Sequence, residues 1–82
     1  MPFALRPTSN FLAEIAKLDK SIRMLIEKRL ERIKQTPRLS KPLEHEPNCY
    51  TERVKGYRIV FEVRGEEVIL YRVRKRKEAY SN

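Results

Sequence analysis

The sequence of 82 residues predicts a single domain, residues 1–82, of the α+β class: two helices followed by an antiparallel sheet. Apolar residues between positions 11 and 33 recur at helical spacing. From Cys49 onward the period changes to two, which is typical of strands. Two short glycine turns, Lys55-Gly56 and Gly65-Glu66, then divide the rest of the chain into hairpins.

The N-terminal third contains signals for a strand and for two helix starts. Residues 3–6 are predicted to form a short strand that Pro7 stops. The N-cap residues at positions 8–10 begin a first helix that is expected to reach Leu18. Asp19 caps a second helix, and its apolar stripe runs to the point where Thr36-Pro37 ends it.

The segment from Pro37 to Asn48 is predicted to be a loop, because three prolines exclude regular structure there. His45 lies in this loop between Glu44 and Glu46. A lone histidine in a polar loop is typical of a solvent-exposed side chain, so no function is assigned to it.

Three strands are predicted after the loop, and the two-residue turns fix how they pair. Arg53 is expected to face Arg58 across the first turn, and Phe61 to face Leu70 across the second. The same register places Val73 opposite Arg58. One face of the sheet is then apolar and suited to pack against the helices, whereas the other is mixed. The strands span Cys49–Val54, Tyr57–Val63 and Val68–Val73.

The charge of the chain predicts a polyanionic partner. Lys and Arg number 19 against 11 Asp and Glu, which gives a formal net charge of +8. Like charges placed opposite each other weaken a sheet, so the facing pair of Arg53 and Arg58 indicates a site for an anion. Guanidinium groups match phosphate oxygens, and RNA or DNA phosphate is the expected ligand. The alternatives are a basic surface that serves only solubility, and neutralisation of the pair by Glu62 or Glu52.

The C-terminal residues add cations and an aromatic ring. Residues 74–77 are four consecutive cations, Arg74, Lys75, Arg76 and Lys77, and Tyr80 follows them. A tyrosine at this spacing can stack on a base of single-stranded RNA. The alternative is a basic tail in which Tyr80 has no role.

Several classes of function lack their signals. Cys49 is the only cysteine, which excludes an internal disulfide and a thiolate zinc site and favours a reducing, cytoplasmic location. The sequence has no apolar run for a signal peptide or a membrane span, no paired-carboxylate motif and no glycine-rich nucleotide loop. No metal, small-molecule cofactor or membrane partner is expected. An RNA-cleaving site would then use the ribose 2′-hydroxyl as nucleophile.

The order of these elements resembles the RelE/ParE superfamily, and within it the RelE-type toxins of toxin–antitoxin pairs. The resemblance covers nearly the whole chain. The segments that carry it are Ala16–Lys20, Lys41-Pro42-Leu43, Cys49-Tyr50, Gly56–Val63 and Val73–Tyr80.

This resemblance implies a compact microbial ribonuclease-like fold, in which an N-terminal helical hairpin packs on a twisted, mainly antiparallel four-stranded sheet. It implies an endoribonuclease that cuts mRNA in the ribosomal A site and inhibits translation, and a RelB-like antitoxin that blocks it. By position, Arg58 matches the arginine that stabilises the transition state, and Arg76 the arginine at the leaving group. Tyr80 matches the tyrosine that stacks the substrate. Arg53 would grip the phosphate with Arg58, while Thr51, Lys55, Arg74, Lys75 and Lys77 would hold RNA.

The chain departs from the family at the general base. The best-studied members carry two lysines where Thr51 and Arg53 stand here. Threonine cannot act as a base, and arginine almost never loses its proton. Lys55, Lys75 and Glu62 are the substitutes, and Arg74 is an alternative to Arg76. A ParE-like gyrase inhibitor and a non-catalytic binding module of the same fold remain alternative functions.

Overall fold

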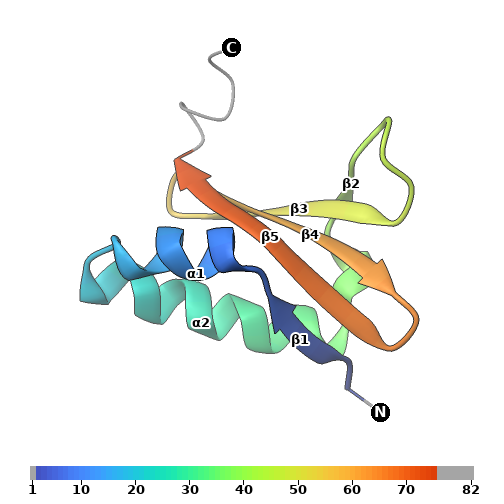
Figure 1. Cartoon of the computed structure of the whole chain (residues 1–82), viewed down its shortest axis with the longest axis horizontal. Helices are drawn as coiled ribbons and strands as arrows, with labels where there is room; N and C mark the ends of the chain where they lie inside the picture. Colours follow the sequence, from blue (N-terminus) through green and yellow to red (C-terminus); the bar gives the residue numbers. More distant parts are fainter. Residues whose placement is uncertain (1, 76–82) are drawn as a thin grey trace.

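The computed structural model describes residues 2–75, and within them the α+β class is confirmed. Two helices lie on one side of a sheet whose strand order is β1-β5-β4-β3-β2 (Figure 1). The prediction of four strands is wrong, because the described part of the sheet has five. The elements are β1 (Ala4–Pro7), α1 (Ser9–Ala16), α2 (Lys20–Gln35), a 3-10 helix (Pro37–Leu39), β2 (Lys41–Pro42), β3 (Cys49–Val54), β4 (Tyr57–Arg64) and β5 (Glu67–Lys75).

The helical hairpin is not the N-terminal element, because β1 precedes it. The strand predicted near residues 3–6 is present and pairs in parallel with β5, with Leu5 opposite Val68. It includes Pro7, which was expected to stop it. A proline is tolerated here because β1 is an edge strand.

The extra strand is β2, so the expectation of a loop without regular structure from Pro37 to Asn48 is wrong in part. Lys41 lies opposite Thr51 and Pro42 opposite Tyr50 at the far edge of the sheet. Proline removes a donor from only one side of a strand, and an edge strand needs partners on only one side. The 3-10 helix begins at Pro37 for a related reason, since proline favours the first turn of a helix.

Both helices begin at the predicted caps. The Thr8 hydroxyl accepts a hydrogen bond from the Phe11 N–H at 3.2 Å, and the Asp19 carboxylate accepts one from the Ile22 N–H at 3.3 Å. The Thr8 hydroxyl also donates to the Leu70 carbonyl at 2.9 Å, which ties the start of α1 to β5. No helix among residues 2–75 is long and apolar enough to cross a membrane.

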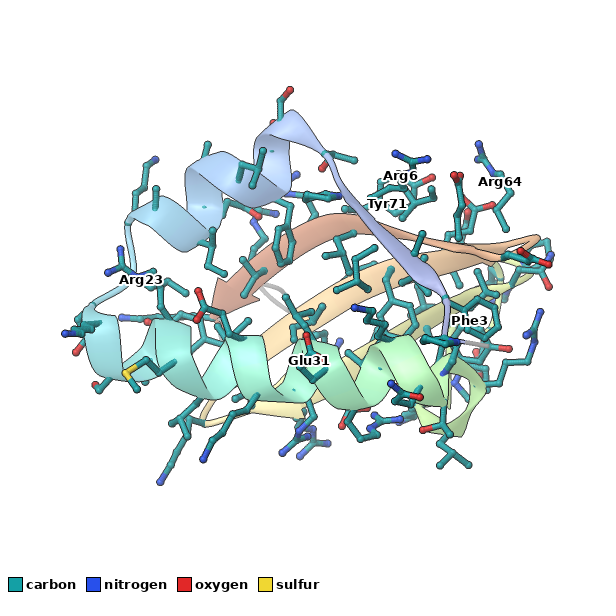
Figure 2. The ribbon with its side chains drawn as sticks, turned by 90° about the horizontal axis from the view of Figure 1, so that it is seen from below. Phe3, Arg6, Arg23, Glu31, Arg64 and Tyr71 are labelled. Atoms are coloured by element: carbon teal, nitrogen blue, oxygen red, sulfur yellow. The ribbon has the colours of Figure 1, made fainter. Side chains whose placement is uncertain are left out.

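The core lies between the helices and one face of the sheet, which the helices cover in Figure 2. Alternate residues of each strand face it, as the period of two predicts. The opposite face carries no helix from the described residues (Figure 1). The buried apolar residues are Phe11, Ile26, Leu30 and Ile33 from the helices, and Val54, Ile59, Phe61, Val63, Val68, Leu70 and Val73 from the strands.

The predicted pairing of β3 with β4 is confirmed, including Arg53 opposite Arg58. The turn between them has positive φ at both central residues, 49° at Lys55 and 80° at Gly56. This conformation is that of the type I′ turn, and its twist matches that of paired strands. Lysine pays a steric cost for this backbone that glycine does not.

The pairing of β4 with β5 follows the prediction only as far as Phe61 and Leu70. A β-bulge then inserts Tyr71, so that Arg58 lies opposite Arg74 and not opposite Val73 as predicted. The bulge shifts the side-chain alternation by one residue. Val73 therefore faces the core with 2% of its surface exposed, whereas it was expected on the mixed face.

A carboxylate joins α2 to the helix-facing side of β3. Glu52 accepts hydrogen bonds from Arg29 and Arg32, each at 2.5 Å, and from the Ser40 hydroxyl at 2.6 Å. Burial by itself raises the pKa of Glu52, but these three donors and the charge of Arg32 outweigh it and hold the pKa below the ordinary value of 4.5.

The lowered pKa predicts that Glu52 stabilises the fold at neutral pH and that this contribution is lost as pH falls below 4.5. We expect Glu52→Gln to lower the free energy of unfolding at pH 7 by about 1 kcal/mol. Between pH 5 and pH 3 the free energy of unfolding should also fall less in the variant than in the native chain, because the variant lacks the titration of this one carboxylate. Urea unfolding followed by circular dichroism measures both effects.

Glu31→Gln is the matched control, because Glu31 lies on the exposed side of α2 (Figure 2). Glu31→Gln removes one negative charge, as Glu52→Gln does, but it leaves the hydrogen bonds of Glu52 in place. Equal acid sensitivity of the two variants would contradict the role of Glu52.

Candidate nucleic-acid interface

Three arginines form a row across the helix-free face of the sheet. Arg53 on β3 pairs with Arg58 on β4, and Arg58 pairs with Arg74 on β5. Residues that pair directly share a face and have Cβ atoms about 5 Å apart. The row therefore gathers three guanidinium groups within reach of one segment of a polyanion.

A hollow of about 400 Å³ lies beside this row. Its floor includes Arg58 and Thr51, and Thr51 is only 7% exposed although it lies on the face without helices. Lys41, directly opposite Thr51, forms part of the wall. The loop that joins β2 to β3 supplies the remainder, and in Figure 1 this loop rises on the side of the sheet away from the helices. The lining residues are Pro42 from β2 and Leu43, Glu44, His45 and Glu46 from the loop.

Glu14 of α1 holds the other end of the row in place. Its carboxylate accepts hydrogen bonds from Arg72 at 2.6 Å and from the Val73 N–H at 2.9 Å, and it lies 3.3 Å from the Nε of Arg74. Burial raises the pKa of Glu14, but the bonds from Arg72 and Val73 and the charges of both arginines lower it below its ordinary value. Arg74 is thus shared between this carboxylate and the arginine row.

Other predicted site residues lie away from the row. Lys75 pairs with Tyr57 and lines a separate hollow with Lys17 and Glu14, on the helix side of the sheet. Lys55 lines a hollow with residues of α2. Arg76, Lys77 and Tyr80 lie outside the described residues. The structure thus places Thr51, Arg53, Arg58 and Arg74 on one face of the sheet, whereas Lys55 and Lys75 do not line the hollow that contains Arg58. Lys75 shares its own hollow with Arg74.

The three substitutes for the missing base are poorly placed. Glu62 is on the correct face but four residues from Arg58, about 13 Å along the strand. It accepts hydrogen bonds from the Tyr71 hydroxyl at 2.5 Å and from Arg64 at 3.0 Å. The bond from Tyr71 is the main cause of a lowered pKa at Glu62, which makes it a weaker base. A base must approach to within about 3 Å of the proton it accepts, and neither Lys55 nor Lys75 shares the hollow with Arg58.

Two features of the site were missed from the sequence. Arg74 joins the row only because of the bulge at Tyr71, and the sequence carries no sharp signal for a bulge. His45 lines the hollow because it lies in the loop that follows β2, and β2 holds the start of this loop at the edge of the sheet beside β3. The only sequence signal for a role of His45 was its position between two acidic residues, Glu44 and Glu46.

Comparison with known proteins agrees with this architecture. The family described as "ParE toxin of type II toxin-antitoxin system, parDE" matches residues 5–80. The mRNA interferase toxin RelE of Escherichia coli (strain K12) is 32% identical over 77 residues, which cover 85% of this chain and 81% of the relative. The chain belongs to the RelE/ParE toxin superfamily.

Solved structures of RelE toxins share the fold of this RelE/ParE member. A variant of the E. coli toxin RelE in the free state superposes with a TM-score of 0.85 and 27% identity, over 96% of this chain and 88% of that chain. The intact E. coli RelBE toxin–antitoxin complex gives a TM-score of 0.81 and 29% identity, over 89% of this chain and 95% of that chain.

The sharing of Arg74 predicts that Glu14 limits the affinity of the row for polyanions. Glu14→Gln keeps an oxygen that can accept from the Val73 N–H but removes the charge that pairs with Arg72 and Arg74. We expect tighter binding of single-stranded oligouridylate and a salt dependence that is steeper by about one unit in the plot of log K against log salt concentration. Fluorescence anisotropy over a salt series measures both.

Glu67→Gln is the control for this experiment. It raises the net charge equally but breaks only the ion pair with Arg6, at the opposite end of β5. If the slope of log K against log salt concentration became equally steep in both variants, the effect would come from the net charge and not from the arginine row.

Proposed function

We propose that this protein is the toxin of a type II toxin–antitoxin pair and that it is a metal-independent endoribonuclease, which cuts mRNA in the ribosomal A site. The observation that carries the proposal is the register that brings Arg53, Arg58 and Arg74 onto one helix-free face beside a hollow. A relative named mRNA interferase toxin RelE, 32% identical, supports the activity. The RelBE complex supports a RelB-like antitoxin as partner. The site of action would be the cytoplasm, where translating ribosomes are.

The reaction is attack by a ribose 2′-oxygen on the adjacent phosphorus. The new bond joins the 2′-oxygen to phosphorus, and the bond from phosphorus to the 5′-oxygen of the next nucleotide breaks. The 2′-hydroxyl proton passes to a base, and the 5′-oxygen takes a proton from an acid. The products are a 2′,3′-cyclic phosphate and a 5′-hydroxyl end, and atoms and charge balance without an oxidant or a metal.

The arginines act on the charge that develops on phosphorus. Arg58 lines the hollow and, with Arg53 beside it, would hold the scissile phosphate through charge-assisted hydrogen bonds. Arg76 would stabilise the leaving oxygen and Tyr80 would stack on a base, as their positions in the family pattern suggest. Thr51 would contact the RNA from the floor of the hollow. Arg74, Lys75, Lys77 and Lys55 would add contacts to mRNA or ribosomal RNA.

The arginine assignment predicts a large loss of activity in Arg58→Ala. Removal of one donor aimed at the transition state typically costs about 100- to 1,000-fold in rate. Arg76→Ala should show a loss of similar size. The measurement is single-turnover cleavage of a short mRNA on programmed ribosomes, with binding to the ribosome followed separately.

Arg64→Ala is the control, because Arg64 lies on the same strand and the same face but pairs with Glu62 at the other end of β4. It should cleave at the native rate. Unchanged cleavage in both Arg58→Ala and Arg76→Ala would disprove the mechanism. Expression of the native chain in cells distinguishes the nuclease from the alternative, a gyrase inhibitor. A gyrase inhibitor would produce DNA breaks, whereas a nuclease would produce cuts in translated messages.

A further inference from the structure

The loop between β2 and β3, residues 43–48, is held at both ends by backbone hydrogen bonds. The Leu43 N–H donates to the Cys49 carbonyl at 2.9 Å, and the Cys49 N–H donates to the Glu46 carbonyl at 3.2 Å. Asn48 adopts a left-handed conformation with φ of 64°, and its carbonyl accepts from the Val63 N–H of β4 at 2.8 Å. These bonds fix where the loop leaves and rejoins the sheet.

The loop therefore forms a defined wall of the hollow that Arg58 also lines. Four side chains in that wall can exchange protons in principle: Lys41, Glu44, His45 and Glu46. On the floor, neither the Thr51 hydroxyl nor the Arg58 guanidinium can serve as a base. The group that accepts the 2′-hydroxyl proton must then come from the wall, if it comes from the described part of the hollow.

His45 is the best suited of the four. An imidazole can accept and release a proton near neutral pH, whereas a lysine acts as a base mainly when it is buried, and Lys41 is exposed. Carboxylates hold protons more weakly than imidazole does. The Glu44 carboxylate lies 3.7 Å from the Nε2 of His45, so it would stabilise the imidazolium that forms when the proton is taken up.

We propose that His45 is a catalytic residue of the cleavage reaction: its imidazole accepts the proton of the 2′-hydroxyl while Arg58, across the hollow, holds the phosphate. This inference rests on the proposed nuclease function. It supplies the base that the family pattern leaves missing at Thr51 and Arg53. Glu44 is a positioning residue in this scheme, because it acts on the reaction through His45.

His45→Ala tests the proposal. A positioned base typically contributes about 100- to 10,000-fold, so we expect single-turnover cleavage on programmed ribosomes to fall by at least about 100-fold. Binding to the ribosome and thermal unfolding should stay at the native values, because the His45 side chain is 92% exposed. Free imidazole in the buffer should restore part of the activity of His45→Ala and none of the activity of Arg58→Ala. Glu44→Gln should lose several-fold.

A substrate with sulfur in place of the bridging 5′-oxygen identifies the step. A thiolate leaves without protonation, so this substrate would relieve the defect of a variant that lacks the acid and not of one that lacks the base. The defect of His45→Ala should therefore persist on it. Relief of the defect would overturn the assignment of His45 as the base.

The outcomes separate this inference from the proposed function. If the native protein does not cut mRNA on ribosomes, the proposed function fails. If the native protein cuts, Arg58→Ala does not and His45→Ala retains full activity, only the role of His45 fails. A loss in His45→Ala that imidazole does not restore would also overturn the catalytic role.

Discussion

The β-bulge at Tyr71 is the feature on which the arrangement of the sheet depends. Without an extra residue in β5, Leu70 and Val73 would lie on opposite faces, since they are three residues apart. With it, both side chains are buried, at 1% and 2% exposure. The same shift brings Arg74 opposite Arg58. One irregularity in the hydrogen-bonding ladder thus completes the core on one face and the arginine row on the other.

Two carboxylates near the arginine row bind arginines of the sheet and of α2. Glu14 holds Arg72 and Arg74 from α1, and Glu52 holds Arg29 and Arg32 on the opposite face of β3. Each carboxylate also joins a helix to a strand, so the neutralisation of charge and the packing of the helices depend on the same contacts. Glu14 thus offsets part of the positive charge at the β5 end of the row, where Arg72 and Arg74 lie.

Local rules were sufficient to predict much of this fold. The caps at Thr8 and Asp19, the change of period at Cys49 and the glycine turns each depend on a few neighbouring residues, and the pairing of Arg53 with Arg58 follows from the length of one turn. The errors lie where distant segments decide the structure. Pro42 could join the sheet only because β3 has a free edge there, and the bulge reflects packing of Val73 against the helices. The placement of His45 in the same hollow as Arg58 depends on β2 and was hidden for the same reason.

The two rims of the sheet also have a consequence for how this basic protein behaves in a crowded solution. On one rim, β2 is only two residues long and presents a lysine and a proline, a combination that gives an incoming strand little to pair with. On the other rim, β1 pairs with the first half of β5. Past the end of β1, the Val73 N–H of β5 donates a hydrogen bond to the Glu14 carboxylate. Edge-to-edge pairing of one molecule's sheet with another's is thereby discouraged, and the cationic face can stay exposed with less risk of aggregation.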